Sequence, residues 1–250
     1  MGRKLWGWLL DYGYLTYWTV RGLLSRSSPE QWLQPGPRPG SPVLLLPGVF
    51  ESWRFLQPVA EHLYAEGHPV HVLAELGWNA GAIPDQAVLV AERLERDDLH
   101  DVTIVAHSKG GLIAKQALTR PDTLARVRHV VTVNTPFAGS RYAAFVLLPS
   151  VRMFAPDAPV IRALAREVAV NHRISSFSSV FDPHIPGRSR LPGAENVLLP
   201  AVGHFRPLAD PRTLRLISAV LERPVPDQPV PEGLGRHERP AGQRLTADRW

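Results

Sequence analysis

The chain has 250 residues, enough for one sizeable α/β domain, and its 44% apolar and 20% charged residues are typical of a protein with a buried core. It contains no cysteine, which excludes disulfides, cysteine nucleophiles and thiolate metal sites and leaves the redox compartment open. The formal charge of +5 favours anionic surfaces, but the basic residues form no single run and no nucleic-acid-binding motif is present. We therefore expect no nucleic acid among its partners.

Residues 1–33 form an aromatic-rich N-terminal segment, whose first 32 residues hold four of the 7 tryptophans and three of the 5 tyrosines. Gly7, Asp11 and Gly13 interrupt its apolar run and no small-residue cleavage site follows, so we expect neither a cleavable signal peptide nor a transmembrane span. The aromatic rings and nearby basic residues favour a helix in a membrane interface, while a helix packed on the domain fits the same residues. The expected location is cytoplasmic or peripherally membrane-associated.

Between residues 34 and 222 the sequence alternates apolar strands with amphipathic helices. This alternation predicts an α/β fold with a mostly parallel central sheet and helices on both of its faces. The expected strands are 43–46, 69–73, 102–106, 128–133, 174–181 and 196–199, and the expected helices are 57–66, 84–96, 110–119 and 207–221. An apolar insertion at 137–170 interrupts the alternation. Residues 223–250 are rich in proline, which predicts a disordered or loosely attached tail.

The strongest functional signal is VTIVAHSKGG at residues 102–111, where an expected strand runs almost directly into an expected helix. So sharp a turn forces its middle residue, Ser108, into a strained conformation and lifts the side chain off the edge of the sheet. The residues two before and two after it, Ala106 and Gly110, are both small, as such a turn requires. Ser108 is therefore the candidate nucleophile, and the alternative is a serine that only caps the following helix.

A serine hydroxyl needs a base to accept its proton and a third group to orient that base. Asp182 follows an expected strand in SSVFDPHIP, and His204 lies between strand and helix in NVLLPAVGHF, in the chain order acid then histidine. Both positions lie where the strands of a parallel sheet end at one edge. His184 is the main rival for the base, and Asp157 and Asp210 are the alternatives for the acid.

An acyl-transfer site also needs N–H donors for the negative oxygen of the intermediate. The residue after the nucleophile, Lys109, is expected to supply one of them. The loop LLLPGVFES after the first strand is expected to supply the other, with Val49 favoured over Phe50. The alternative is that Pro47-Gly48 in this loop forms only a turn.

In family order, the segments LLLPGVF, VAHSKGG, VNTPFAGS, FDPHIP and VLLPAVGH resemble the bacterial lipase and esterase branch of the α/β-hydrolase superfamily. The resemblance covers most of the domain. It implies ester hydrolysis by Ser108, Asp182 and His204 as a catalytic triad, with the oxyanion donors named above and no cofactor. The sequence departs from the family pattern at Ala106, where glycine is commonest, and at Pro47, which replaces a histidine.

The insertion at 137–170 lies where such enzymes often carry a lid or the walls of an acyl-binding site. Phe50, Phe137 and Phe145 are therefore the expected substrate-binding residues, with a lipid-like ester as the expected substrate, and additional core packing is the alternative for the insertion. No cluster of histidine and carboxylate residues has the spacing of metal ligands, so no metal is expected.

The leading hypothesis is a serine hydrolase that cleaves lipid-like carboxylic esters through an acyl-enzyme on Ser108. One alternative is an acyltransferase, in which an alcohol replaces water as the acceptor of the acyl group. Another is a non-catalytic binding protein with the hydrolase fold. The triad residues do not distinguish the hydrolase from the acyltransferase, and a complete Ser/Asp/His set argues against the binding protein.

Overall fold

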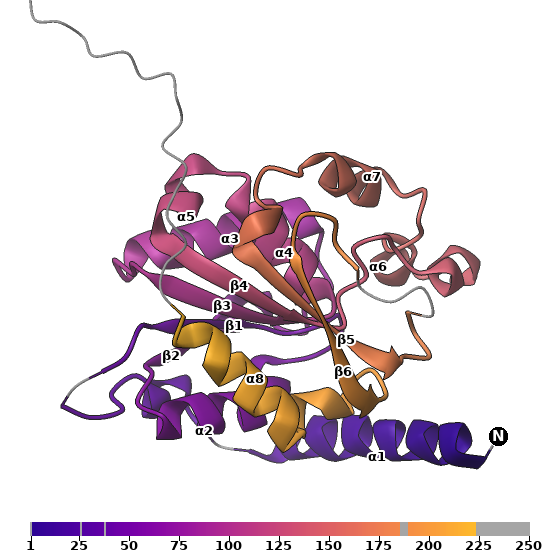
Figure 1. The fold of residues 1–250 in the computed structure, drawn as a ribbon, viewed down its shortest axis with the longest axis horizontal. Coiled ribbons are helices and arrows are strands. Elements are labelled where there is room, and N and C mark those ends of the chain that lie inside the picture. Colours follow the sequence, from indigo (N-terminus) through magenta and orange to yellow (C-terminus); the bar gives the residue numbers. More distant parts are fainter. Residues whose placement is uncertain (1, 26, 38, 186–189, 224–250) are drawn as a thin grey trace, which may run out of the picture.

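A six-stranded sheet, parallel throughout, lies at the centre of the molecule (Figure 1). The computed structural model describes residues 2–25, 27–37, 39–185 and 190–223, and of residues 2–6 and 8 it describes only the backbone. The strands are β1 (Val43–Leu46), β2 (Val70–Val72), β3 (Val102–His107), β4 (Val127–Val133), β5 (Ile174–Phe181) and β6 (Glu195–Val202). Their order across the sheet is β2-β1-β3-β4-β5-β6. The parallel sheet predicted from the sequence is confirmed.

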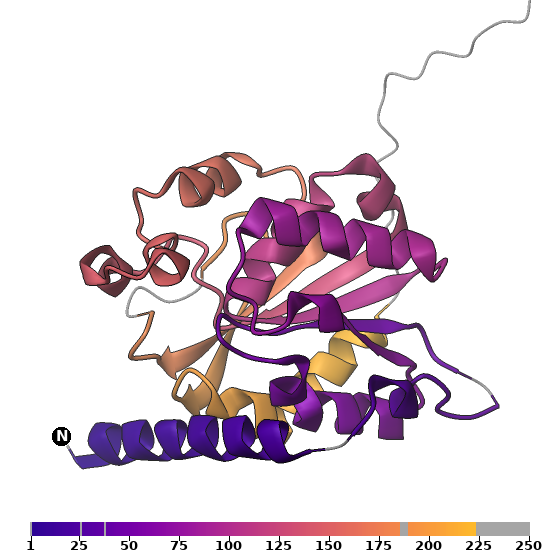
Figure 2. The same ribbon diagram turned by 180° about the vertical axis from the view of Figure 1, so that it is seen from behind.

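Helices cover both faces of the sheet, as the alternating pattern predicts (Figures 1 and 2). They are α1 (Gly2–Leu24), α2 (Gln57–Ala65), α3 (Ile83–Arg96), α4 (Lys109–Leu118), α5 (Pro121–Arg126), α6 (Pro149–Arg152), α7 (Pro159–Arg166) and α8 (Pro211–Leu221). One face carries α3, α4 and α5, and the other carries α2 and α8 with α1 alongside. Asp210 caps α8, since its carboxylate accepts a hydrogen bond from the Arg212 N–H at 2.7 Å.

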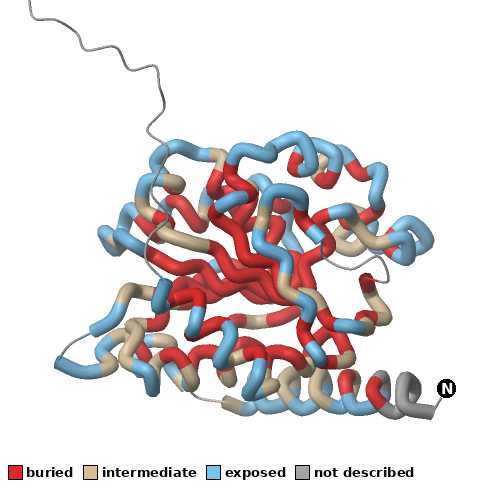
Figure 3. Tube along the Cα trace, in the orientation of Figure 1, coloured by how far each residue is buried: buried red, intermediate tan, exposed pale blue. Residues whose placement is uncertain are grey.

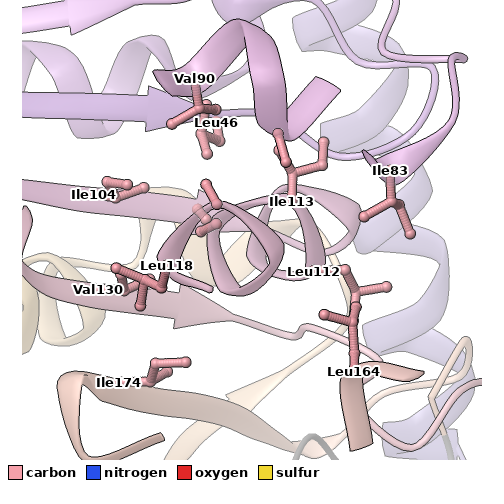
Figure 4. Packing of buried hydrophobic residues seen from close by; sticks show 14 of the residues in the cluster. Leu46, Ile83, Val90, Ile104, Leu112, Ile113, Leu118, Val130, Leu164 and Ile174 are labelled. Atoms are coloured by element: carbon pink, nitrogen blue, oxygen red, sulfur yellow. The ribbon is translucent and has the colours of Figure 1, made fainter. Parts of the chain in front are cut away.

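The strands divide their side chains between two cores because successive residues of a strand point to opposite faces. In β1, Leu44 and Leu46 join the core of α3 and α4, whereas Val43 and Leu45 join the core of α2 and α8. Figure 4 shows part of the first core, and Figure 3 shows that the sheet is buried along most of its length. Burial of both faces explains why these strands are unbroken apolar runs in the sequence.

The largest differences from the expected elements lie near the end of the domain. β6 continues to Val202, past the expected end at residue 199, because an edge strand tolerates Pro200, which has no N–H to donate. The expected helix at 207–221 is divided into a 3₁₀ turn at Arg206–Ala209 and α8, since Asp210 begins a new helix. Helix α5 was not expected. The predicted tail, apart from Arg223, lies outside the described residues.

The apolar insertion at 137–170 folds into a 3₁₀ turn at Arg141–Phe145 followed by α6 and α7. Ile161 and Leu164 of α7 are buried in the core that contains α3 and α4, so part of the insertion is additional core. Residues 145–148, in contrast, are exposed.

Helix α1 packs along the domain on the side of α2 and α8 (Figure 2). A Cβ atom at Gly7 would come within 2.7 Å of the Val202 side chain, which shows how closely α1 approaches the end of β6. Tyr14 packs edge-on against Phe55, with ring centroids 5.7 Å apart. The helix thus packs on the domain, as one of the two expectations holds, while contact with a membrane interface stays a prediction. Within the described part of the chain, no helix is long and apolar enough to cross a bilayer.

Candidate active site

The turn between β3 and α4 holds Ser108 at φ 48° and ψ −116°, a conformation that residues other than glycine rarely adopt. The Ser108 N–H donates to the carbonyl oxygen of Val133 at 2.9 Å, which ties the turn to the end of β4. Gly110 is needed because a Cβ atom there would come within 2.3 Å of the Leu46 carbonyl oxygen. The strained turn expected from the sequence is thus present, and it places Ser108 at the carboxyl end of β3.

Ser108, His204 and Asp182 form a chain of hydrogen bonds in which all three side chains are buried. His204 Nε2 lies 3.0 Å from Ser108 Oγ, and His204 Nδ1 lies 2.6 Å from Asp182 Oδ2. The other carboxylate oxygen of Asp182 accepts hydrogen bonds from the N–H groups of His184 at 2.8 Å and Ile185 at 3.2 Å. The structure therefore brings together the three residues that the sequence analysis singled out, and it fixes both ends of the imidazole.

Opposing effects set the pKa values of this buried pair. Burial raises the pKa of Asp182, but the charge and hydrogen bond of His204 lower it, and the net shift is downward. Burial lowers the pKa of His204, but Asp182, followed by Glu51 and Asp11, raises it, and the net shift is upward. An ionised carboxylate thus faces Nδ1, which carries a proton, and in the neutral ring Nε2 is left to accept the Ser108 hydroxyl.

The alternative acid and base residues are placed differently. The His184 ring lies beside that of His204, with centroids 4.9 Å apart, but its Nε2 is hydrogen-bonded to the Tyr12 hydroxyl at 3.2 Å. Burial lowers the pKa of His184 to about 4. Asp210 is the cap of α8, and Asp157 is an exposed residue of the insertion. The geometry thus favours His204 and Asp182 over each rival.

The loop after β1 is more than a simple turn, because the buried Glu51 side chain holds it in place. Glu51 Oε2 accepts the Gly48 N–H at 2.6 Å and also lies 2.9 Å from His107 Nδ1. A Cβ atom at Gly48 would come within 2.7 Å of the Glu51 carboxylate, so the loop requires glycine there. The other ring nitrogen of His107 lies 3.0 Å from the His204 carbonyl oxygen. Glu51 and His107 therefore connect this loop to the backbone of the candidate base.

The two expected oxyanion donors come from the start of α4 and from the loop after β1. The Lys109 N–H is the first of α4 and, like the first N–H groups of any helix, has no intrahelical acceptor. Val49 lines the same cavity as Ser108. The Lys109 side chain points elsewhere, since its Nζ donates to the carbonyl oxygens of Asn79 at 2.7 Å and Gly81 at 2.6 Å. Burial lowers the pKa of this ammonium to about 8.

A cavity of about 490 Å³ opens over Ser108 and His204, and most of its walls are apolar. Of the three expected substrate-binding residues, Phe50 lines this cavity. The expectations for Phe137 and Phe145 need correction. Phe137 is a buried member of the core beside α4, and Phe145 is 85% exposed, and neither lines the cavity. The insertion lines the cavity through other residues, namely Ser140, Tyr142, Ala143, Val146, Val151 and Phe154.

Sequence reasoning missed Glu51 and the contribution of α1. Tyr12 and Leu15 of α1 form part of the cavity wall, although α1 lies far from the triad residues in the chain. The sequence did contain a signal for α1, because Asp11 is an acidic residue in an otherwise apolar segment. The structure shows that Asp11 is buried, and a buried carboxylate needs partners. Within the described ranges, no group of three or more His, Cys, Asp or Glu side chains is arranged to hold a metal ion.

No protein-family model matches the sequence, and a comparison with curated proteins finds no match. Solved structures do match. A mature lipase from Bacillus licheniformis has a TM-score of 0.61 and 17% identity, over 78% of this chain and 99% of that one. An α/β-hydrolase from a sediment metagenome of the Mar Chica lagoon has a TM-score of 0.55 and 14% identity, over 72% and 90%. The naproxen esterase of Bacillus subtilis has a TM-score of 0.51 and 14% identity, over 74% and 85%. At such identities the likeness concerns the fold.

The strained backbone at Ser108 leads to a prediction about stability. A non-glycine residue in such a conformation costs about 1–3 kcal/mol, and the added chain entropy of glycine offsets roughly 0.5–1 kcal/mol of the relief. Ser108→Ala keeps the strain, whereas Ser108→Gly relieves it. The free energy of unfolding of Ser108→Gly should therefore be higher by about 1 kcal/mol, and urea denaturation measures the difference. Equal stabilities of the two variants would show that the turn stores no strain.

Proposed function

Because the chain has the α/β-hydrolase fold, we propose that it is a serine hydrolase that cleaves carboxylic esters. The observation that carries the proposal is the buried hydrogen-bond chain from Asp182 through His204 to Ser108 at the floor of an apolar cavity. A serine, a base within hydrogen-bonding distance and a carboxylate that orients the base together form the arrangement that activates a hydroxyl for attack.

The geometry supports a two-step acyl transfer. Ser108 Oγ attacks the ester carbonyl carbon while His204 Nε2 takes the hydroxyl proton, and Asp182 stabilises the imidazolium through the Nδ1–H. The N–H groups of Val49 and Lys109 stabilise the negative oxygen of the tetrahedral intermediate. The imidazolium then protonates the departing alkoxide, which leaves an acyl group on Ser108. Water activated by His204 releases the acid and restores the serine.

The shape and polarity of the cavity favour an ester with an apolar acyl group. A volume of about 490 Å³ suits a small ligand rather than a protein chain. Its apolar lining, which includes Leu15, Val146 and Phe154, gains free energy by removing hydrocarbon from water. The substrate class that we propose is therefore a lipid-like ester.

A fluorophosphonate probe tests this function without knowledge of the substrate, because such probes react with activated serines. We expect the wild type to be labelled and Ser108→Ala and His204→Ala to lose labelling, with ester hydrolysis falling by about 10⁴-fold or more in each. Ser140→Ala is the matched control, since Ser140 lines the same cavity but donates its hydroxyl to the His184 carbonyl oxygen. A folded wild type that resists labelling, or His204→Ala that labels normally, would contradict the proposal.

The pH dependence of hydrolysis follows from the environment of His204. The base acts only when it is neutral, and Asp182 raises the pKa of His204 despite the opposing effect of burial. The acid limb of kcat/KM should therefore have a midpoint above about 6.5, the usual value for histidine, and activity should rise with pH through that midpoint. Steady-state rates on an activated ester from pH 4 to 9 measure it. A midpoint below about 6.5, the pKa of an unperturbed histidine, would show that the acid limb of kcat/KM reports the titration of a group other than His204.

We also propose that α1 and the insertion together make peripheral contact with an anionic lipid surface. Both α1 and the insertion line the cavity, and both expose apolar side chains, with Leu24 77% and Leu147 89% exposed. Helix α1 contains a single acidic residue, Asp11, which is buried, and the part of the insertion that lines the cavity, residues 140–154, contains none; the exposed Asp157 and Glu167 follow it. Exposed arginines lie in the same segments at positions 21, 141 and 152. An apolar and basic surface of this kind binds anionic bilayers.

Vesicle flotation tests the lipid contact. Replacing both Leu24 and Leu147 by aspartate should lower the bound fraction on phosphatidylglycerol vesicles by about ten-fold or more, because it removes apolar area and adds negative charge. Val88→Asp is the control, since Val88 is an exposed apolar residue of α3, lies on the face of the sheet opposite to α1 and neither lines the cavity nor belongs to the insertion. If the double variant and this control bind vesicles equally well, α1 and the insertion do not form the lipid-binding surface.

A further inference from the structure

The turn that carries His204 is held by a carboxylate from the other end of the chain. Asp11 of α1 has 0% exposure, and its Oδ2 accepts the His204 N–H at 2.7 Å. Its Oδ1 accepts the N–H groups of Phe205 and Arg206, each at 2.9 Å. One side chain thus binds three successive backbone donors, and the first of them belongs to the candidate base.

The local sequence accommodates this close approach. Gly203 has φ +113°, and a Cβ atom there would come within 2.3 Å of Asp11 Oδ1, so the residue before His204 must lack a side chain. A buried carboxylate is costly unless it is paired or hydrogen-bonded. Among the side chains that the structure describes, which do not include those of Arg3 and Lys4, no lysine or arginine forms an ion pair with Asp11; the backbone N–H groups supply the compensation.

The next residue of α1 connects the helix to the loop that carries the candidate acid. The Tyr12 hydroxyl lies 3.2 Å from His184 Nε2, and the His184 N–H donates to Asp182 Oδ1 at 2.8 Å. Two adjacent residues of one helix therefore contact both the loop after β5 and the turn after β6. These are the two segments whose separation decides whether Asp182 reaches His204.

We propose that Asp11 is a positioning residue for His204, and that α1 completes the active site by fixing the His204 turn relative to Ser108 and Asp182. The inference rests on the proposed serine-hydrolase function. His204 must keep hydrogen bonds to both Asp182 and Ser108 at once. Its ring therefore tolerates little displacement, because hydrogen bonds weaken steeply with misalignment. Anchoring the backbone N–H of the base itself is the most direct way to limit that displacement.

The negative charge of Asp11 gives the proposal a second observable. The titratable and charged groups that face His204 are the carboxylates of Asp182, Glu51 and Asp11 and the rings of His184 and His107, with Tyr12 behind His184. Asp11 is among the groups that raise the pKa of His204. Loss of its charge should therefore shift the acid limb of kcat/KM to lower pH, a change that a purely structural residue would not cause.

Asp11→Asn is the sharpest test, because it keeps the size of the side chain and removes the charge. The amide has one acceptor oxygen, so its NH₂ group must face at least one backbone N–H. We expect kcat to fall by about ten- to a hundred-fold with little change in KM, and the acid limb to shift to lower pH. Asp210→Asn is the matched control: it also removes a carboxylate that accepts a backbone N–H, but on α8, and it should keep both kcat and the acid limb.

Proton NMR gives a readout that needs no turnover. The proton between His204 Nδ1 and Asp182 should resonate far downfield, and the signal should shift or broaden in Asp11→Asn but not in Asp210→Asn. Unlabelled wild-type protein in the fluorophosphonate assay would reject the proposed function, while the NMR comparison would still decide the positioning role. A folded Asp11→Asn with unchanged kcat, acid limb and resonance overturns the inference.

A second variant covers the case in which Asp11→Asn does not fold. Tyr12→Phe removes only the hydroxyl that contacts His184 and keeps the ring in the cavity wall. It should lower kcat by a few-fold without a matching change in KM, because the loop of Asp182 loses its contact with α1. Unchanged kcat in this variant would overturn the role of α1 in completing the site.

Discussion

The strands of this sheet all run in one direction, so their carboxyl ends meet at a single edge, and every part of the candidate site depends on that constraint. β1 and β3 are neighbours, but the chain leaves β1 toward β2 on one side and leaves β3 toward β4 on the other. A crevice forms where connections diverge in this way. The loop with Val49 follows β1 and Ser108 follows β3, and both residues line the same cavity.

Backbone groups compensate most of the charge buried around this edge. Asp11 is bound by three N–H groups, Glu51 by the N–H of Gly48, and the ammonium of Lys109 by two carbonyl oxygens. Backbone dipoles cannot rotate away as solvent does, so each charge fixes the loop that surrounds it. The charges that flank Ser108 therefore also define the shape of the site. Asp182 and Glu51 are in addition each matched by an imidazole, Asp182 by His204 and Glu51 by His107.

The features that are encoded by a few consecutive residues were the most predictable. Unbroken apolar strands and the short connection around Ser108 indicated both the parallel sheet and the strained turn, because these features are encoded within a few residues. The edge strand β6 was underestimated, since Pro200 usually ends a strand and only the position at the edge permits it. Phe137 and Phe145 were misplaced because an apolar insertion does not reveal which side chains face the core, the cavity or the solvent. The tie between Asp11 and His204 was not predictable, as no local pattern relates residues so far apart.

That long separation has a consequence for how the protein is made. Asp11 and His204 are 193 positions apart in the chain, and a nascent polypeptide grows from its N-terminus. Helix α1 is therefore synthesised long before the turn to which it is anchored, and its buried carboxylate has no backbone partners until β6 has emerged. A chain that ends before β6 lacks both the backbone donors that Asp11 binds and the candidate base, His204. The candidate site would then be completed only late in folding, after the turn at His204 has been synthesised and has docked on α1.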